Sequence, residues 1–234
     1  MMTIERCEGA CYDSYIMHAT WQFKLARLIA RAIFVCLFRV RVIGLENVPK
    51  TSYIACVNHL GWAEGFMVIL FFPTEPRFYG LGERQVMERS RFRRWFFKQV
   101  DVLIPLERDK PREAIRVMEA VLKRGGALGM APEGTLGAQE GTISELQEGA
   151  AFLSVRTGVP LLPVGATGTL ELWLRKKLTL RVGRPIDPNE FVGASHTRVQ
   201  AMTARLTEEL RALLPGDDPM PRVKLLRTWL TNLF

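Results

Sequence analysis

A histidine and an acidic residue five positions apart are the first candidates for chemistry in this chain. They are His59 and Glu64, in the stretch 54–64. An imidazole with one nitrogen held by a carboxylate presents its other nitrogen as a general base toward a hydroxyl. On one continuous helix the two side chains would point about 140° apart. The spacing therefore predicts general-base chemistry if His59 precedes the helix that carries Glu64.

The residues around this pair predict a strand followed by a helix. Residues Tyr53–Val57 form a short apolar run of β-prone residues, and Trp62–Phe72 is apolar at helical length. His59 then falls in the turn between them, and Glu64 falls in the first turn of the helix. We expect the chain to curl between the two residues, so that the carboxylate reaches one imidazole nitrogen.

Two later stretches also contain residues that are expected at a binding site. Residues 131–135 follow a predicted strand, Ala127–Met130, and place Glu133 at its carboxyl end, where open α/β sheets bind ligands. Gly134 lets the backbone turn where a side chain would block a substrate. Residues 159–167 predict another strand that contains Pro160 and Pro163. Because proline disrupts a central ladder, we expect this strand to flank the site and to contribute an apolar wall.

In order and spacing, these three stretches resemble the glycerolipid acyltransferases, the 1-acylglycerol-3-phosphate acyltransferase group in particular. The resemblance runs from about Val42 to Ile186, and several blocks in order are more specific than one short pattern. This chain has a His-x4-Glu variant of the family's His-x4-Asp pattern. It also has Ala131 where the family has phenylalanine, and Leu136 where the family has an arginine associated with the acceptor phosphate.

The resemblance implies an O-acyltransferase. It would move a fatty acyl group from acyl-CoA or acyl-acyl carrier protein to the free hydroxyl of a lysophospholipid, with 1-acylglycerol-3-phosphate as the expected acceptor and phosphatidic acid as product. His59 would act as the base and Glu64 would hold its tautomer, with backbone amides near the turn as oxyanion donors. No metal, cofactor or covalent serine is required. The expected substrate-binding residues are Asn58, Arg108, Glu133, Gly134, Thr135 and Pro163.

Other functions stay open beside this one. Because Leu136 replaces the family arginine, the acceptor is alternatively a lysolipid without an exposed phosphate monoester, such as an ornithine lipid precursor or a lysophosphodiester. A non-catalytic lipid-binding homologue is a second alternative. The net charge of +8 and the basic, aromatic segment 89–98 also suit a nucleic-acid binder. That hypothesis leaves the ordered blocks unexplained, so we predict no nucleic-acid partner.

Predicted strands alternate with predicted helices, among them Pro111–Lys123, which Gly125-Gly126 ends, and Ser144–Arg156. This alternation indicates an α/β fold. We expect a single domain with a mostly parallel or mixed central sheet flanked by helices, plus amphipathic helices at both ends. A chain of 234 residues with 48% hydrophobic residues suits one core. The predicted organisation is an N-terminal membrane-contacting segment, 1–41, an acyltransferase domain, 42–214, and a C-terminal basic amphipathic helix, 215–234.

The two end segments predict contact with a phospholipid membrane. Residues Trp21–Val42 form an apolar helix with a basic stripe of Lys24, Arg27, Arg31 and Arg39, which is typical of a helix in a bilayer interface and also of one that caps a core. The C-terminal helix is either a second membrane contact or a lid over the core. No apolar stretch reaches the roughly 18 residues of a spanning helix, and the first twenty residues do not resemble a secretory signal. We therefore expect a peripheral protein on the cytoplasmic face of the cell membrane.

Overall fold

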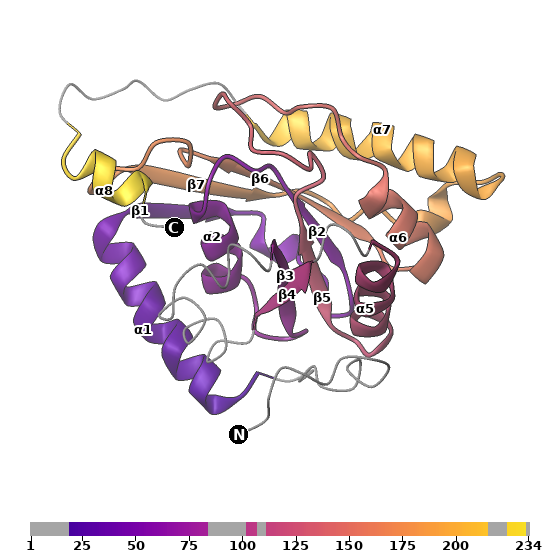
Figure 1. The fold of residues 1–234 in the computed structure, drawn as a ribbon, viewed down its shortest axis with the longest axis horizontal. Coiled ribbons are helices and arrows are strands. Elements are labelled where there is room, and N and C mark those ends of the chain that lie inside the picture. The colour runs from indigo at the N-terminus through magenta and orange to yellow at the C-terminus, as the bar shows by residue number, and fades with distance from the viewer. Residues whose placement is uncertain (1–18, 84–101, 107–110, 215–223, 233–234) are drawn as a thin grey trace.

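The computed structural model describes residues 19–83, 102–106, 111–214 and 224–232. Two of the sequence predictions lie outside these residues, namely the substrate contact of Arg108 and the basic segment 89–98. The described strands form one mixed sheet in the order β1-β7-β6-β2-β5-β3-β4 (Figure 1). Their bounds are β1 Arg39–Ile43, β2 Ile54–Val57, β3 Phe78–Glu83, β4 Leu103–Leu106, β5 Ala127–Met130, β6 Leu161–Thr167 and β7 Lys177–Val182.

Helices cover both faces of this sheet, as the α/β prediction required (Figure 1). Helices α1 (Trp21–Leu37) and α2 (Ala63–Phe71) lie on one face. The other face is covered by α5 (Pro111–Lys123), α6 (Gly149–Thr157) and α7 (Ser195–Leu213). The remaining elements are the 3-10 turns η2 (Leu45–Asn47) and η3 (Pro188–Glu190) and the short helix α8 (Arg227–Thr231).

Strand β2 lies at the centre of the sheet and separates the two cores. Ala55 and Val57 point toward α1 and α2, whereas Ile54 and Cys56 point toward α6 and α7, as alternation along a strand requires. Full burial of a side chain such as Ile54 contributes about 1.5–3 kcal/mol. The strand is parallel to both of its neighbours, β5 and β6, so the carboxyl ends of all three meet at one edge.

The prediction that the proline-containing strand flanks the sheet is wrong. Strand β6 lies inside the sheet, parallel to β2 and antiparallel to β7. Pro163 is accommodated because its carbonyl still accepts from Gly183 N, at 2.9 Å. Proline has no N–H and so cannot donate the reciprocal bond of this pair.

Two predicted boundaries also shift. The helix expected from Ser144 begins at Gly149, because residues 141–148 form a loop that closes over the end of β5. The predicted boundary between residues 41 and 42 cuts β1, which begins at Arg39 and pairs with β7 through five residues. The strand that follows α1 is therefore part of the sheet.

Two cations of helix α1, Arg27 and Arg31, make contacts with α2, whereas Lys24 is exposed. Arg27 donates to the carbonyls of Ile69 (2.8 Å) and Leu70 (3.0 Å) and to that of Phe72, and so caps the carboxyl end of α2. Arg31 stacks over the Phe71 ring at 4.8 Å. Part of the predicted basic stripe therefore contacts the protein itself rather than a membrane surface. Within the described residues, none of the helices is both long and apolar enough to span a membrane.

Candidate active site

His59 and Glu64 are in direct contact at the carboxyl end of β2. His59 Nδ1 lies 2.9 Å from Glu64 Oε1, which confirms the predicted curl of the chain between them. Val57 ends β2 and Ala63 begins α2, so the residues between form the strand-to-helix turn. The imidazole is 41% exposed and the carboxylate is 3% exposed. Nδ1 is therefore held from inside the protein, and Nε2 is the nitrogen left for a substrate.

Glu64 is fixed by the turn that it closes. Its Oε1 also accepts from the backbone N–H groups of Leu60 and Gly61, both at 2.7 Å. The residue lies in the first turn of α2, where a negative charge is favoured by the helix dipole. Its Oε2 is buried and has no hydrogen-bond partner among the described residues. One carboxylate oxygen thus orders three consecutive residues, His59, Leu60 and Gly61.

Glu133 ties the end of β5 to the same turn. It is buried, and its two oxygens accept from the backbone N–H groups of His59 (2.8 Å) and Ser144 (2.9 Å). The sequence predicted that Glu133 contacts the substrate. The structure instead places both of its oxygens on the protein backbone, where they hold His59 and the loop 141–148.

We expect Glu133→Gln to destabilise the fold. A glutamine amide offers one acceptor oxygen, so one of the two backbone N–H groups would face an NH₂ donor. A buried donor left without an acceptor costs about 1–3 kcal/mol, which chemical denaturation measures. The exposed Glu145 of the same loop provides the control Glu145→Gln, which is expected to unfold like the wild type. Equal stability of the two variants would contradict this role of Glu133.

The side chain of Asn58 binds the backbone of β6 and does not face solvent. Its amide nitrogen donates to Ala166 O (3.0 Å) and its amide oxygen accepts from Ala166 N (2.7 Å). The side chain is 1% exposed. Asn58 was predicted to bind substrate, but these bonds use its side chain to extend the pairing of β2 and β6 by one step. We assign it a positioning role for the neighbouring His59.

Three backbone amides of the turn are already bonded within the protein and are not available as oxyanion donors. The N–H of His59 donates to Glu133, and those of Leu60 and Gly61 donate to Glu64. The expectation that amides near the turn stabilise an oxyanion does not hold for these three, because two buried carboxylates accept from them. Charge that develops on a substrate oxygen must be stabilised by other donors.

Of the remaining predicted substrate-binding residues, Gly134 and Thr135 follow Glu133, whereas Pro163 lies away from His59. Gly134 adopts φ +70°, a conformation that favours glycine, and Gly134 and Thr135 are exposed directly after Glu133. Pro163 is buried opposite Cys56, three residues before His59 along the sheet, which corresponds to roughly 10 Å. The structure thus brings His59, Glu64, Asn58, Glu133 and Gly134 together but does not bring Pro163 to the imidazole.

One residue at the site, Gly137, was missed by the sequence prediction. Gly137 donates its N–H to His59 O at 2.7 Å, and a Cβ at this position would lie only 2.9 Å from Leu60 Cδ2. The clustering of glycines at 134, 137 and 141 was the signal for such a close approach. Leu136, next to it, has a side chain that is 63% exposed and so presents an apolar group beside the site.

This arrangement is suited to remove a proton from a hydroxyl at the protein surface. The exposed imidazole edge is available to a substrate, while the buried Glu64 fixes the ring and stabilises a positive charge on it. Glu133, Asn58 and Gly137 hold the backbone on three sides of His59. A base that is held in this way loses little freedom when the substrate arrives.

Comparisons with known proteins agree on one family. A family model described as "Acyltransferase" matches residues 39–167. The chain is 25% identical over 180 residues to the 1-acyl-sn-glycerol-3-phosphate acyltransferase of Bacillus subtilis, a match that covers 74% of this chain and 87% of that protein. The enzyme of that name from Saccharomyces cerevisiae is 30% identical over 138 residues, which cover 57% of this chain and 44% of the yeast protein.

A solved structure gives the same result for the fold. The crystal structure of the 1-acyl-sn-glycerophosphate (LPA) acyltransferase from Thermotoga maritima superposes with a TM-score of 0.61 and 25% sequence identity. The superposition covers 83% of this chain and 81% of that one.

Proposed function

This chain belongs to the acyltransferase family, and we propose that it transfers a fatty acyl group from a thioester to the free hydroxyl of a lysophospholipid. The proposed acceptor is 1-acylglycerol-3-phosphate, and the proposed product is phosphatidic acid. The donor is acyl-CoA or acyl-acyl carrier protein. The observation that carries this proposal is the 2.9 Å contact between His59 Nδ1 and the buried Glu64. The enzymes of B. subtilis and S. cerevisiae support the choice of acceptor.

In the proposed reaction His59 acts as a general base. Its Nε2 takes the proton from the acceptor hydroxyl as the hydroxyl oxygen forms a bond to the thioester carbonyl carbon. The carbon–sulfur bond then breaks, and the proton passes from the imidazolium to the leaving sulfur. Glu64 keeps Nδ1 protonated toward itself and stabilises the imidazolium between the two proton transfers.

Incubation of the purified protein with a labelled acyl donor tests the proposal. The donor is supplied in turn as acyl-CoA and as acyl-acyl carrier protein, each with 1-acylglycerol-3-phosphate in detergent micelles. We expect labelled phosphatidic acid with at least one donor. If neither donor labels any lysolipid while the protein still binds liposomes, a non-catalytic lipid-binding role replaces this proposal.

A second acceptor is favoured by one observation. Leu136, at the position of the family arginine, exposes an apolar side chain next to the loop residue that holds His59 O. We therefore include a lysophosphodiester and an ornithine lipid precursor in the acceptor panel. Faster transfer to either one than to 1-acylglycerol-3-phosphate would make an acceptor without a phosphate monoester the main substrate.

We also propose that α1 contacts the membrane that supplies the lipid substrates, on its cytoplasmic face. Besides the contacts of Arg27 and Arg31 with α2, the helix exposes a row of large apolar side chains at intervals of three and four residues, a spacing typical of one helix face. These are Trp21, Leu25, Leu28, Ile29 and Ile33. Such a face is buried favourably in the interface of a bilayer.

Charge on this apolar face is expected to weaken membrane binding. In Leu28→Glu the leucine that would enter the lipid is lost, and burial of such a side chain contributes about 1.5–3 kcal/mol. We therefore expect the partition coefficient to fall roughly tenfold or more, as measured by co-sedimentation with vesicles of phosphatidylcholine and phosphatidylglycerol. Ala204→Glu, on the exposed side of α7, adds the same charge and serves as the control. Similar binding by both variants would exclude α1 as the contact.

A further inference from the structure

The C-terminal segment Lys224–Asn232 is bound to the body of the protein by hydrogen bonds and ion pairs. Thr231 Oγ1 bonds both the N–H of Leu172 (2.9 Å) and its carbonyl (3.2 Å). Leu174 N donates to Leu225 O at 2.9 Å. Leu230 is completely buried in the core between the sheet, α1 and α2. Of the two roles predicted for this segment, these contacts match a lid over the core.

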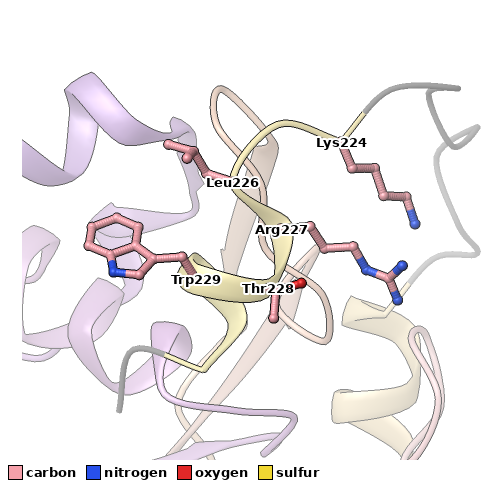
Figure 2. A pocket seen from close by; sticks show the side chains of 5 residues that line it. All are labelled: Lys224, Leu226, Arg227, Thr228 and Trp229. Carbon is pink, nitrogen blue, oxygen red and sulfur yellow. The ribbon is translucent and has the colours of Figure 1, made fainter.

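An acidic residue on the loop 168–176 holds the start of the segment. Glu171 accepts from Lys224 at 2.6 Å and also pairs with Arg227. The hydrogen bond from Lys224 is the largest cause that holds the pKa of Glu171 below its usual range. This stabilisation is present at neutral pH and is lost as the pH falls through the lowered pKa. Figure 2 shows Lys224 and Arg227 on one side of the segment, and Leu226 and Trp229 on the other.

Trp62 connects this segment to the catalytic turn. Its Nε1 donates to Leu230 O at 3.1 Å, and the backbone of the preceding residue, Gly61, donates to Glu64. The indole ring is fixed by edge contacts with Phe34 (6.2 Å between centroids) and Phe66 (5.4 Å). Trp62 is also the last residue before α2 begins. A displacement of the indole would therefore move the residues that hold Glu64.

The loop 168–176 reaches the same turn from another side. A Cβ on Gly61 would lie 3.5 Å from Thr169 O, so the loop packs directly on the turn. Glu140 fixes this part of the loop by accepting from Gly168 N (3.0 Å) and Leu170 N (2.8 Å). Further along the same loop, Leu172 and Leu174 bind the C-terminal segment. The segment thus acts on the turn both through Trp62 and through the loop.

We infer that Lys224–Asn232 is a positioning element for acyl transfer, and that it holds the His59–Glu64 turn in its reactive geometry through Trp62 and Thr231. Its kinetic test rests on the proposed function. None of its side chains needs to touch a substrate. The effect is expected in kcat rather than in KM, because the segment orders the base and not the binding of donor or acceptor.

Two variants separate this role from a general effect on folding. Thr231→Val removes both bonds to Leu172 at nearly constant volume, and Trp62→Phe removes the bond to Leu230 while an aromatic ring remains. We expect each to lower kcat about tenfold, below the roughly 10²-fold that a 1 Å displacement of reacting groups costs. KM for the donor is expected to stay within about a factor of two. Thr231→Ser, which keeps the hydroxyl, is expected to restore kcat.

Thr207→Val is the matched control. Thr207 bonds Thr203 O within α7 at 2.8 Å, so the substitution removes a similar hydroxyl bond away from the turn. We expect wild-type kcat for this variant. Thermal unfolding of all variants must show that the protein is folded at the assay temperature. Wild-type kcat in both Thr231→Val and Trp62→Phe would overturn the inference, as would a loss of activity that only follows the folded fraction.

A spectroscopic measurement tests the inference without any turnover. The chain has three histidines, so ¹⁵N-labelled imidazoles give few signals, and His59→Gln identifies that of His59. We expect the Nδ1 proton of His59 to shift or broaden in Thr231→Val but not in Thr207→Val. An unchanged signal in both would overturn the inference. If the wild type acylates no lysolipid, the proposed function fails, while this signal still decides whether the segment positions His59.

Discussion

His59→Ala is expected to reduce kcat for acyl transfer by about 10²- to 10⁴-fold, the usual contribution of a positioned general base. Among the described residues of this site, the exposed imidazole is the group that can accept the hydroxyl proton, because the carboxylates of Glu64 and Glu133 are buried and bonded to the turn. KM values are expected to change little, since His59 acts on the transition state. Initial rates with saturating donor and acceptor measure the effect.

The variant His196→Ala provides the control for His59→Ala. His196 is exposed at the start of α7, and its loss is expected to leave kcat unchanged. Both variants should unfold at about the wild-type temperature, because the imidazole of His59 is 41% exposed and contributes little to the core. If His59→Ala keeps more than about a tenth of the wild-type rate, His59 is not the base.

Glu64→Gln is expected to have the second-largest effect on kcat. The substitution keeps the size of the side chain and removes the negative charge that orients Nδ1 and stabilises the imidazolium. We expect a fall of at least about 10²-fold, up to the roughly 10⁴-fold seen when the orienting carboxylate of a Ser-His-Asp triad becomes an amide. The stability is also expected to fall, because a neutral amide oxygen accepts more weakly than a carboxylate from the N–H groups of Leu60 and Gly61.

Glu64→Asp separates the charge of this residue from its reach. Aspartate keeps the charge but is one methylene shorter, so it cannot span the 2.9 Å contact with Nδ1 unless the turn moves. We expect a rate between those of Glu64→Gln and the wild type. A rate equal to that of Glu64→Gln would show that position matters more than charge. Wild-type activity in Glu64→Gln would remove Glu64 from the mechanism.

Local sequence was sufficient to predict most elements of the fold. The observed helix Pro111–Lys123 and strand Ala127–Met130 have the predicted bounds, because their apolar periodicity and the Gly125-Gly126 stop are local properties. The turn that joins His59 to Glu64 was predictable for the same reason. The two are five positions apart, and a strand must end before the helix begins.

Predictions that depended on partners far along the chain were less successful. The inner position of β6 depends on its pairing with β2 and β7, whereas the prolines of the strand had predicted a flanking position. The start of the helix expected at Ser144 depends on a bond to Glu133. The inward direction of Arg27 depends on unpaired carbonyls at the end of α2, 42 and 43 residues away.

The sequence by itself predicted that His59 and Glu64 meet, because that contact is made within a single turn, and it indicated them as the groups that we propose for the chemistry. The tertiary structure decided what holds the pair in place. Glu133 reaches the backbone of His59 across 74 residues, Asn58 reaches Ala166 across 108, and Trp62 reaches Leu230 across 168. A carboxylate or an amide binds whichever backbone group the packed strands bring within about 3 Å, and that neighbour is chosen by the pairing of whole strands rather than by nearby residues.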